Sequence, residues 1–182
     1  MRRGQALPAR DAISQIMTAY FTQPWANFFV AAAGASGALV GLVMVALSVN
    51  INPILKSFHL PARAAAAIAT LVLALVCSMA ELIPQKTSML AAEILVFAML
   101  AWLIQLRSAQ QAFAAKLQVR RPLYETLAGI IIGQIQVLPF LIGGILELNE
   151  TEKSVYWIAA GTIAVFIFSV FNAWVLLIEI LR

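Results

Sequence analysis

The stretch that decides the class of this protein runs from Asn27 to Asn50 and reads NFFVAAAGASGALVGLVMVALSVN. Its length suits a bilayer, because about 20 apolar helical residues, each rising ~1.5 Å, cross the ~30 Å hydrocarbon core. At helical spacing it presents one stripe of mostly small or polar side chains: Asn27, Val30, Gly34, Gly37, Gly41, Met44 and Ser48. Such a stripe, with a GxxxG motif at Gly37 and Gly41, lets another helix approach closely in lipid.

The composition of the whole chain also indicates an integral membrane protein. The chain has 182 residues, of which 63% are hydrophobic and 11% are charged, and its mean hydropathy is +0.93. Soluble domains carry about 45–50% apolar and ~25% charged residues. The chain has a net charge of +4. In a membrane protein, Lys and Arg usually indicate which loops face the cytoplasm, so we do not interpret this charge as a sign of nucleic-acid binding. The single cysteine, Cys77, excludes an intrachain disulfide.

Hydrophobic segments along the chain predict an all-α, polytopic membrane helical bundle formed by a single domain, residues 1–182. The five predicted spans are, approximately, 27–50, 64–83, 89–106, 126–146 and 155–180. The short link between the second and third spans predicts an antiparallel hairpin. The third helix is expected to continue beyond its span toward Pro122, and Pro139 is expected to kink the fourth.

The segment before the first span predicts an amphipathic helix over residues 11–23. Asp11 is placed to cap it, and apolar side chains recur at i, i+3, i+4 and i+7 from Ile13 to Tyr20. Pro24 is expected to end this helix. We interpret it as an interfacial helix on the membrane surface, with packing against cytosolic loops as the alternative.

The positive charges near the span ends favour an external N-terminus and an internal C-terminus. The larger and closer set of basic residues lies on the side predicted to be internal: Lys56, Arg63, Arg107, Lys116, Arg120, Arg121 and Arg182. The basic amphipathic N-terminal helix argues the other way, because the inner leaflet is anionic.

Polar side chains in or beside the spans are candidates for an ion or polar site, because polar groups in lipid are costly and often functional. These candidates are Glu81, Glu93, Gln134, Gln136 and Asn172. Glu81 and Glu93 flank the hairpin turn and suit a cation site repeated by oligomerisation. The alternatives are that these carboxylates reach the headgroups or pair with Lys86, and that the amides form interhelical hydrogen bonds. Gln134 and Gln136 should point to nearly opposite faces.

No arrangement of residues in the sequence suggests catalysis. The chain has no HExxH motif, no GxSxG motif and no nucleotide-binding glycine loop, and its one histidine, His59, is predicted in a loop. We therefore expect a non-enzymatic protein without a metal or another cofactor.

Two resemblances lie in the first half of the chain. The pattern Trp25-x-x-Phe28-Phe29, the run Gly34–Asn50 and the later Leu60-Pro61-x-Arg63-Ala64 resemble a family of small bacterial membrane proteins, some labelled FtsH-protease modulators. This resemblance implies a multi-pass protein of the bacterial inner (plasma) membrane. The run Gly41–Leu47 is similar to the pore helix of the Orai calcium channels. Val49 or Asn50 stands where that family has its acidic filter residue, so calcium selectivity is not implied.

These observations leave three functions open. The first is an ion channel or pore subunit of a homo-oligomer, whose first span lines the axis through Asn27, Gly34, Gly37, Gly41, Met44, Ser48 and Asn50. The second is an accessory or regulatory subunit that binds another membrane protein, for example a membrane protease, through the same stripe. The third is a small-solute transporter, for which Pro139 and its flanking glycines argue.

The position of the stripe separates these hypotheses. Burial of the stripe within one monomer would remove the main support for both oligomeric functions. The polar ends of the first span, on a helix without charge, also mark it as the predicted central helix, whether the centre is a pore or a core.

Overall fold

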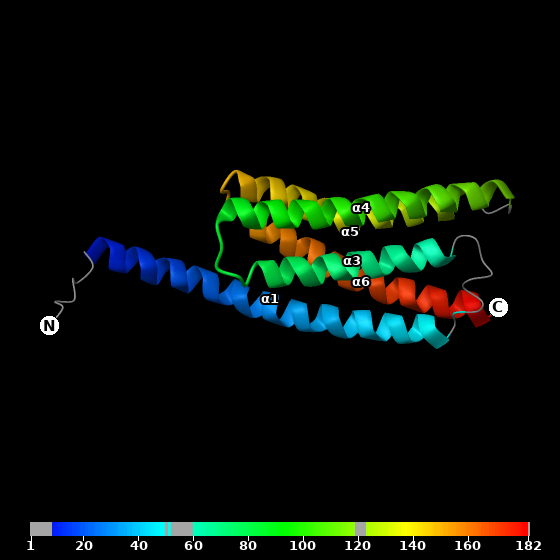
Figure 1. Cartoon of the computed structure of the whole chain (residues 1–182), viewed down its shortest axis with the longest axis horizontal. Helices are drawn as coiled ribbons and strands as arrows, with labels where there is room; N and C mark the ends of the chain where they lie inside the picture. The colour runs from blue at the N-terminus through cyan, green and yellow to red at the C-terminus, as the bar shows by residue number, and fades with distance from the viewer. Residues whose placement is uncertain (1–8, 50, 52–59, 119–122, 182) are drawn as a thin grey trace.

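A computed structural model describes the backbone of residues 9–49, 51, 60–118 and 123–181, and the side chains of residues 25–49, 51, 61–114, 127, 129–171 and 174. Its long helices lie side by side along one axis (Figure 1). In the part of the chain that is described there are five of them: α1 (Ala9–Val49), α3 (Leu60–Ala80), α4 (Thr87–Gln118), α5 (Leu123–Leu148) and α6 (Ser154–Leu181).

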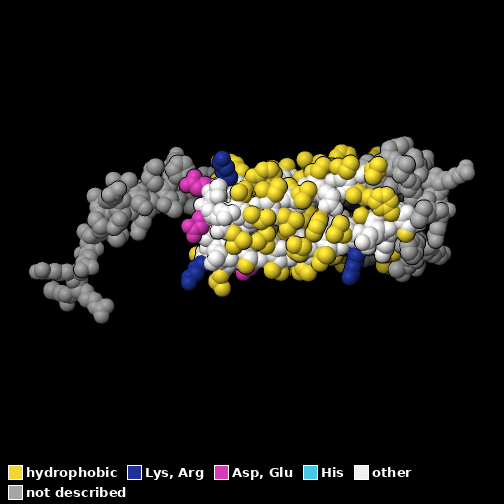
Figure 2. Space-filling model, turned by 90° about the horizontal axis from the view of Figure 1, so that it is seen from above, with side chains coloured by type: hydrophobic (Ala, Val, Ile, Leu, Met, Phe, Trp, Pro, Cys, Tyr) yellow, Lys and Arg dark blue, Asp and Glu magenta, His cyan; other side chains and the backbone are white. Residues whose placement is uncertain are grey.

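Each of these helices contains a stretch long and apolar enough to cross a membrane. These stretches overlap the predicted spans and are, in chain order, Trp25–Val49, Pro61–Ala80, Thr87–Ala114, Gly129–Leu148 and Ser154–Phe171. On the face seen in Figure 2, hydrophobic side chains cover the middle of the bundle and charged side chains lie toward its ends. By helix length and hydropathy, the chain is a multi-pass membrane protein.

The link between α3 and α4 is short and comprises residues 81–86. α3 ends at Ala80, before the predicted end of the second span at residue 83, and the Ile83 N–H donates to the Ala80 carbonyl (3.2 Å) in a tightened last turn. The Lys86 carbonyl accepts the Met89 N–H (2.9 Å) and begins α4. The two helices pack against each other, as the predicted hairpin requires, and α4 continues to Gln118.

The central helix of the monomer's core is α3, so the first span is not at the centre of the core, and its place at the centre of a pore stays a prediction. α3 packs against α1, α4 and α6, and half of its apolar stretch (50%) is buried, against 22% for α1. The cause is the distribution of small side chains. Alanines on several sides of α3 are buried, which lets neighbouring helices approach it from more than one direction: Ala64, Ala66, Ala67, Ala74 and Ala80.

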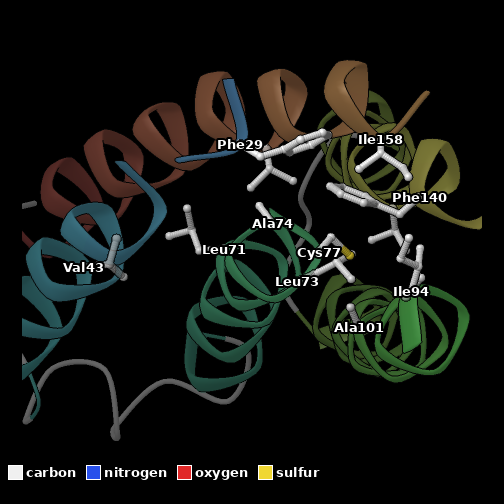
Figure 3. Packing of buried hydrophobic residues seen from close by; sticks show 13 residues of the cluster. Phe29, Val43, Leu71, Leu73, Ala74, Cys77, Ile94, Ala101, Phe140 and Ile158 are labelled. Carbon is white, nitrogen blue, oxygen red and sulfur yellow. The ribbon is translucent and has the colours of Figure 1, made fainter. Parts of the chain in front are cut away.

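Large side chains from all five helices meet around α3. Leu71 lies on the side of α3 toward α1, and Leu73 and Cys77 lie on the side toward α4, while Phe140 of α5 and Ile158 of α6 lie next to each other (Figure 3). Glycine makes the approach of α5 and α6 possible, since a Cβ on Gly161 would lie 2.8 Å from Phe140 Cε2.

Two prolines, Pro24 and Pro139, lie in the interior of helices. α1 runs without a break from Ala9 to Val49, so the predicted helix end at Pro24 is not present, and α5 likewise continues through Pro139. A proline removes one backbone hydrogen bond but does not oblige a helix to end. The first turns of α1 extend beyond the bundle (Figure 1). Their side chains are outside the described part, so the interfacial placement of residues 11–23 remains a prediction.

Candidate functional site

The small-residue stripe of the first span lies on the outer surface of the monomer. Its described members are all exposed: Asn27, Val30, Gly34, Gly37, Gly41, Met44 and Ser48. A Cβ built on any of its three glycines would meet no heavy atom within 4 Å. We call this surface the glycine face of α1. Asn50, the last predicted member, lies outside the described residues.

A different side of α1 holds it to the bundle. Phe29, Ala32, Ser36 and Val43 are buried, with exposed fractions no greater than the 6% of Val43. Trp25 packs edge-on against Tyr156 of α6, with 4.9 Å between ring centroids, and also lies near Phe28 and Phe29. The monomer therefore fixes α1 through bulky side chains and leaves the glycine face outside.

The polar groups of the glycine face are few and uncharged. The Ser48 hydroxyl donates to the Met44 carbonyl one turn earlier (2.8 Å), which satisfies the hydroxyl within its own helix. Asn27 is exposed near the other end of the same span. The face is therefore neutral along its length and polar toward both ends.

The two glutamines of α5 point in different directions, as their spacing predicts. Trp102 Nε1 of α4 donates to Gln134 Oε1 (2.7 Å), so Gln134 joins two helices. Gln136 is buried, and its Nε2 donates to the Ile132 carbonyl of its own helix (3.4 Å). Its Oε1 is buried without a partner among the described residues. The side chain of Asn172 is not described.

The bond between Trp102 and Gln134 should couple the two side chains energetically. In a double-mutant cycle with Trp102→Phe and Gln134→Leu, we expect a coupling of about 0.5–1.5 kcal/mol, since interhelical hydrogen bonds in membranes are modest. Equilibrium unfolding in mixed micelles measures it. The control pair is Trp102→Phe with Gln136→Leu, and an equal coupling in both pairs would contradict the assignment.

The predicted carboxylates of the hairpin have different surroundings. Glu93 is exposed on α4 and accepts a hydrogen bond from Gln85 Nε2 (3.0 Å), so Gln85 rather than Lys86 is its observed partner. Glu81 follows the last residue of α3 and is half-buried. Its Oε1 is buried without a hydrogen-bond partner among the described residues. The structure therefore separates Glu81 from Glu93.

The Glu81 carboxyl is close enough to a second carboxylate to be affected by its negative charge, and the sequence analysis did not single out that residue. Burial raises the pKa of the Glu81 carboxyl from its ordinary 4.5 to about 7, and the nearby Glu147 carboxylate raises it further. Glu147, near the end of α5, accepts a hydrogen bond from the Ser154 hydroxyl at the start of α6. Their proximity depends on how α3 and α5 each pack against α4 and α6, which no local sequence pattern encodes.

This raised pKa predicts a pH-dependent stability. The folded protein binds the Glu81 proton more tightly than the unfolded chain does. The stabilisation that this proton gives the fold is therefore complete below pH 4.5 and is lost as the pH rises through about 7. In sodium-free micelles at pH 8, Glu81→Gln should stabilise the protein by about 1–2 kcal/mol, discounted for partial exposure. Apparent Tm from pH 5 to 8 checks this. Glu152→Gln is the control, and a parallel pH profile in Glu81→Gln would contradict the prediction.

Comparisons with known proteins do not assign this chain to a family. No family model matches the chain, and no curated protein and no solved structure is significantly similar to it. The fold defines the class as a multi-pass membrane protein, with five helices long and apolar enough to span a membrane in the described part of the chain. Its particular features are an exposed glycine face on α1 and a half-buried carboxyl at the end of α3.

Proposed function

We propose that this protein is a non-enzymatic ion channel or pore subunit of the bacterial plasma membrane, in which copies assemble with α1 facing the common axis. The observation that carries the proposal is that the glycine face is exposed on the surface of the monomer and is covered by none of the other described helices. Glycine offers few atoms for contact with lipid tails, whereas a second helix gains close packing against it. The face is therefore better suited to another helix than to lipid.

The length and polarity of the glycine face support a position at an axis. It extends from Asn27 to Ser48, and this helical rise matches the ~30 Å hydrocarbon core. The glycines leave space in its middle, and Asn27 and Ser48 offer polar groups toward its ends. The resemblance of Gly41–Leu47 to the Orai pore helix agrees with this arrangement. The face has no charged residue, so we propose no ion selectivity.

Cysteine accessibility tests this function directly. In a Cys77→Ala background reconstituted into planar bilayers, a thiol-reactive cation should reduce the conductance of the Ser48→Cys variant by at least about tenfold, because the added charge stands in the narrow path. The matched control is Leu42→Cys, because Leu42 is exposed on α1 and lies on a side of the helix away from Ser48. Equal inhibition of both variants, or no conductance in the unmodified protein, would contradict a pore lined by α1.

A second candidate is an accessory subunit that binds another membrane protein through α1. The specific observation in its favour is the length of α1, which begins at Ala9, well before the apolar stretch at Trp25, and extends beyond the bundle (Figure 1). The resemblance to proteins labelled FtsH-protease modulators points the same way. This function predicts a monomer in a membrane mimetic, whereas the channel requires an oligomer.

A further inference from the structure

Two buried oxygen atoms without hydrogen-bond partners among the described residues belong to side chains one helical turn apart at the end of α3. Ser78 is fully buried (0% exposed), and neither its Oγ nor Glu81 Oε1 has a hydrogen-bond partner among the described residues. The Glu81 N–H still donates to the Cys77 carbonyl (3.1 Å), so Glu81 keeps its helical position. Residues at i and i+3 share a helix face, which places both oxygens on one side of α3. Buried polar atoms are normally satisfied, and such a pair indicates an absent partner.

The absent partner should carry a positive charge. The C-terminal end of a helix such as α3 has a partial negative charge from its last carbonyls. The Glu147 carboxylate acts on Glu81 from α5 and is itself held by Ser154. Among the residues whose side chains are described, the other charged groups at this end of the bundle are Lys86 and Glu93 at the start of α4 and Glu150, Glu152 and Lys153 before α6, and all of them are exposed.

We propose that Ser78, Glu81 and Glu147 form a binding site for a monovalent cation, Na⁺, within each subunit. Carboxylate, hydroxyl and carbonyl oxygens are the ligands that such hard cations prefer. The site lies inside the monomer and away from the glycine face, so it does not depend on the proposed pore.

Protons should compete with Na⁺ for this site. Burial raises the pKa of the Glu81 carboxyl, so part of the population holds a proton near neutral pH when no cation is bound. Where Glu81 is protonated, binding of Na⁺ releases that proton, so the charge of the site does not change. This exchange makes occupancy of the site measurable through the protonation state of one carboxyl group.

Labelling with dicyclohexylcarbodiimide, which reacts with protonated buried carboxyls, tests the proposal on the full chain in lipid nanodiscs. At pH 7 in choline chloride, we expect modification of Glu81, read by peptide mass. Replacing choline by Na⁺ at equal ionic strength should reduce the labelled fraction at least about fivefold, as expected for a site near saturation. Ser78→Ala should keep the labelling and lose most of the Na⁺ protection.

The controls separate cation binding from altered reactivity. Glu81→Gln should abolish labelling, and Glu152→Gln should retain both labelling and Na⁺ protection. In unmodified protein, Na⁺ should also raise the apparent Tm relative to choline, and this shift should be smaller in Ser78→Ala. The proposal is overturned if Na⁺ leaves the labelling of the unmodified protein unchanged, or if it protects Ser78→Ala to the same degree.

Discussion

Gly37→Leu should dissociate the assembled protein into folded monomers of 19.7 kDa. A leucine at Gly37 would place its side chain on the glycine face and prevent the close helix approach that this face allows. The monomer itself should tolerate the change, since nothing lies within 4 Å of the added Cβ. We expect association to weaken by at least about tenfold, or ~1.4 kcal/mol. Sedimentation equilibrium in detergent measures this change.

The matched control for this variant is Ala35→Leu. Ala35 is also exposed on α1 but lies on a side of the helix away from Gly37, so a leucine there should leave the oligomeric mass unchanged. Circular dichroism should show the same helicity for both variants. Equal mass for Gly37→Leu and the unmodified protein would remove the proposed role of the face.

Gly161→Ala should destabilise the bundle strongly although it adds one methyl group. The added Cβ would lie 2.8 Å from Phe140 Cε2, and the Phe140 ring is fully buried and has little space to move. Overpacking of this kind costs about 1–3 kcal/mol. For a chain of this length, that corresponds to a decrease in apparent Tm of about 2–12 °C. Thermal unfolding followed by circular dichroism in micelles measures it.

Gly129→Ala provides the control for this prediction on α5. Gly129 is exposed, and an added Cβ there would meet no heavy atom within 4 Å. Alanine is the better helix former by about 0.5–1 kcal/mol, so this variant should be as stable as the unmodified protein or slightly more stable. Similar destabilisation of both variants would mean that the contact between Gly161 and Phe140 does not limit the packing of α6 on α5.

The spans could be predicted from the sequence because the requirement of a bilayer for apolar length is local. Each hydrophobic segment meets that requirement by itself, whichever helices surround it. The end at Pro24 was wrong for the opposite reason. A proline in the sequence shows where a backbone hydrogen bond is lost, but it does not show whether the residues on either side continue as one helix.

The place of each helix in the bundle could not be predicted from its own stripe of small residues. The first span and α3 both carry such residues, but the bundle uses the alanines of α3 internally and leaves Gly37 and Gly41 outside. Bulky side chains such as Phe29, on another side of α1, decide this orientation. A stripe pattern shows where a helix can approach closely, but it does not show which helix will do so.

The candidate site was predicted only in part for a similar reason. The spacing of Gln134 and Gln136 correctly predicted different directions, since helical periodicity is local. The partners Trp102 and Glu147 come from other helices and depend on their packing. Unpartnered oxygens such as Ser78 Oγ can be recognised only when the surrounding helices are in place.

The central claim is that the glycine face of α1 joins copies of this chain. The most direct test is native mass spectrometry of the unmodified protein released from lipid nanodiscs. The claim predicts one dominant species whose mass is an integer multiple, greater than one, of the 19.7 kDa subunit. A spectrum containing only the 19.7 kDa monomer, at protein concentrations where the nanodiscs hold several copies, would contradict it.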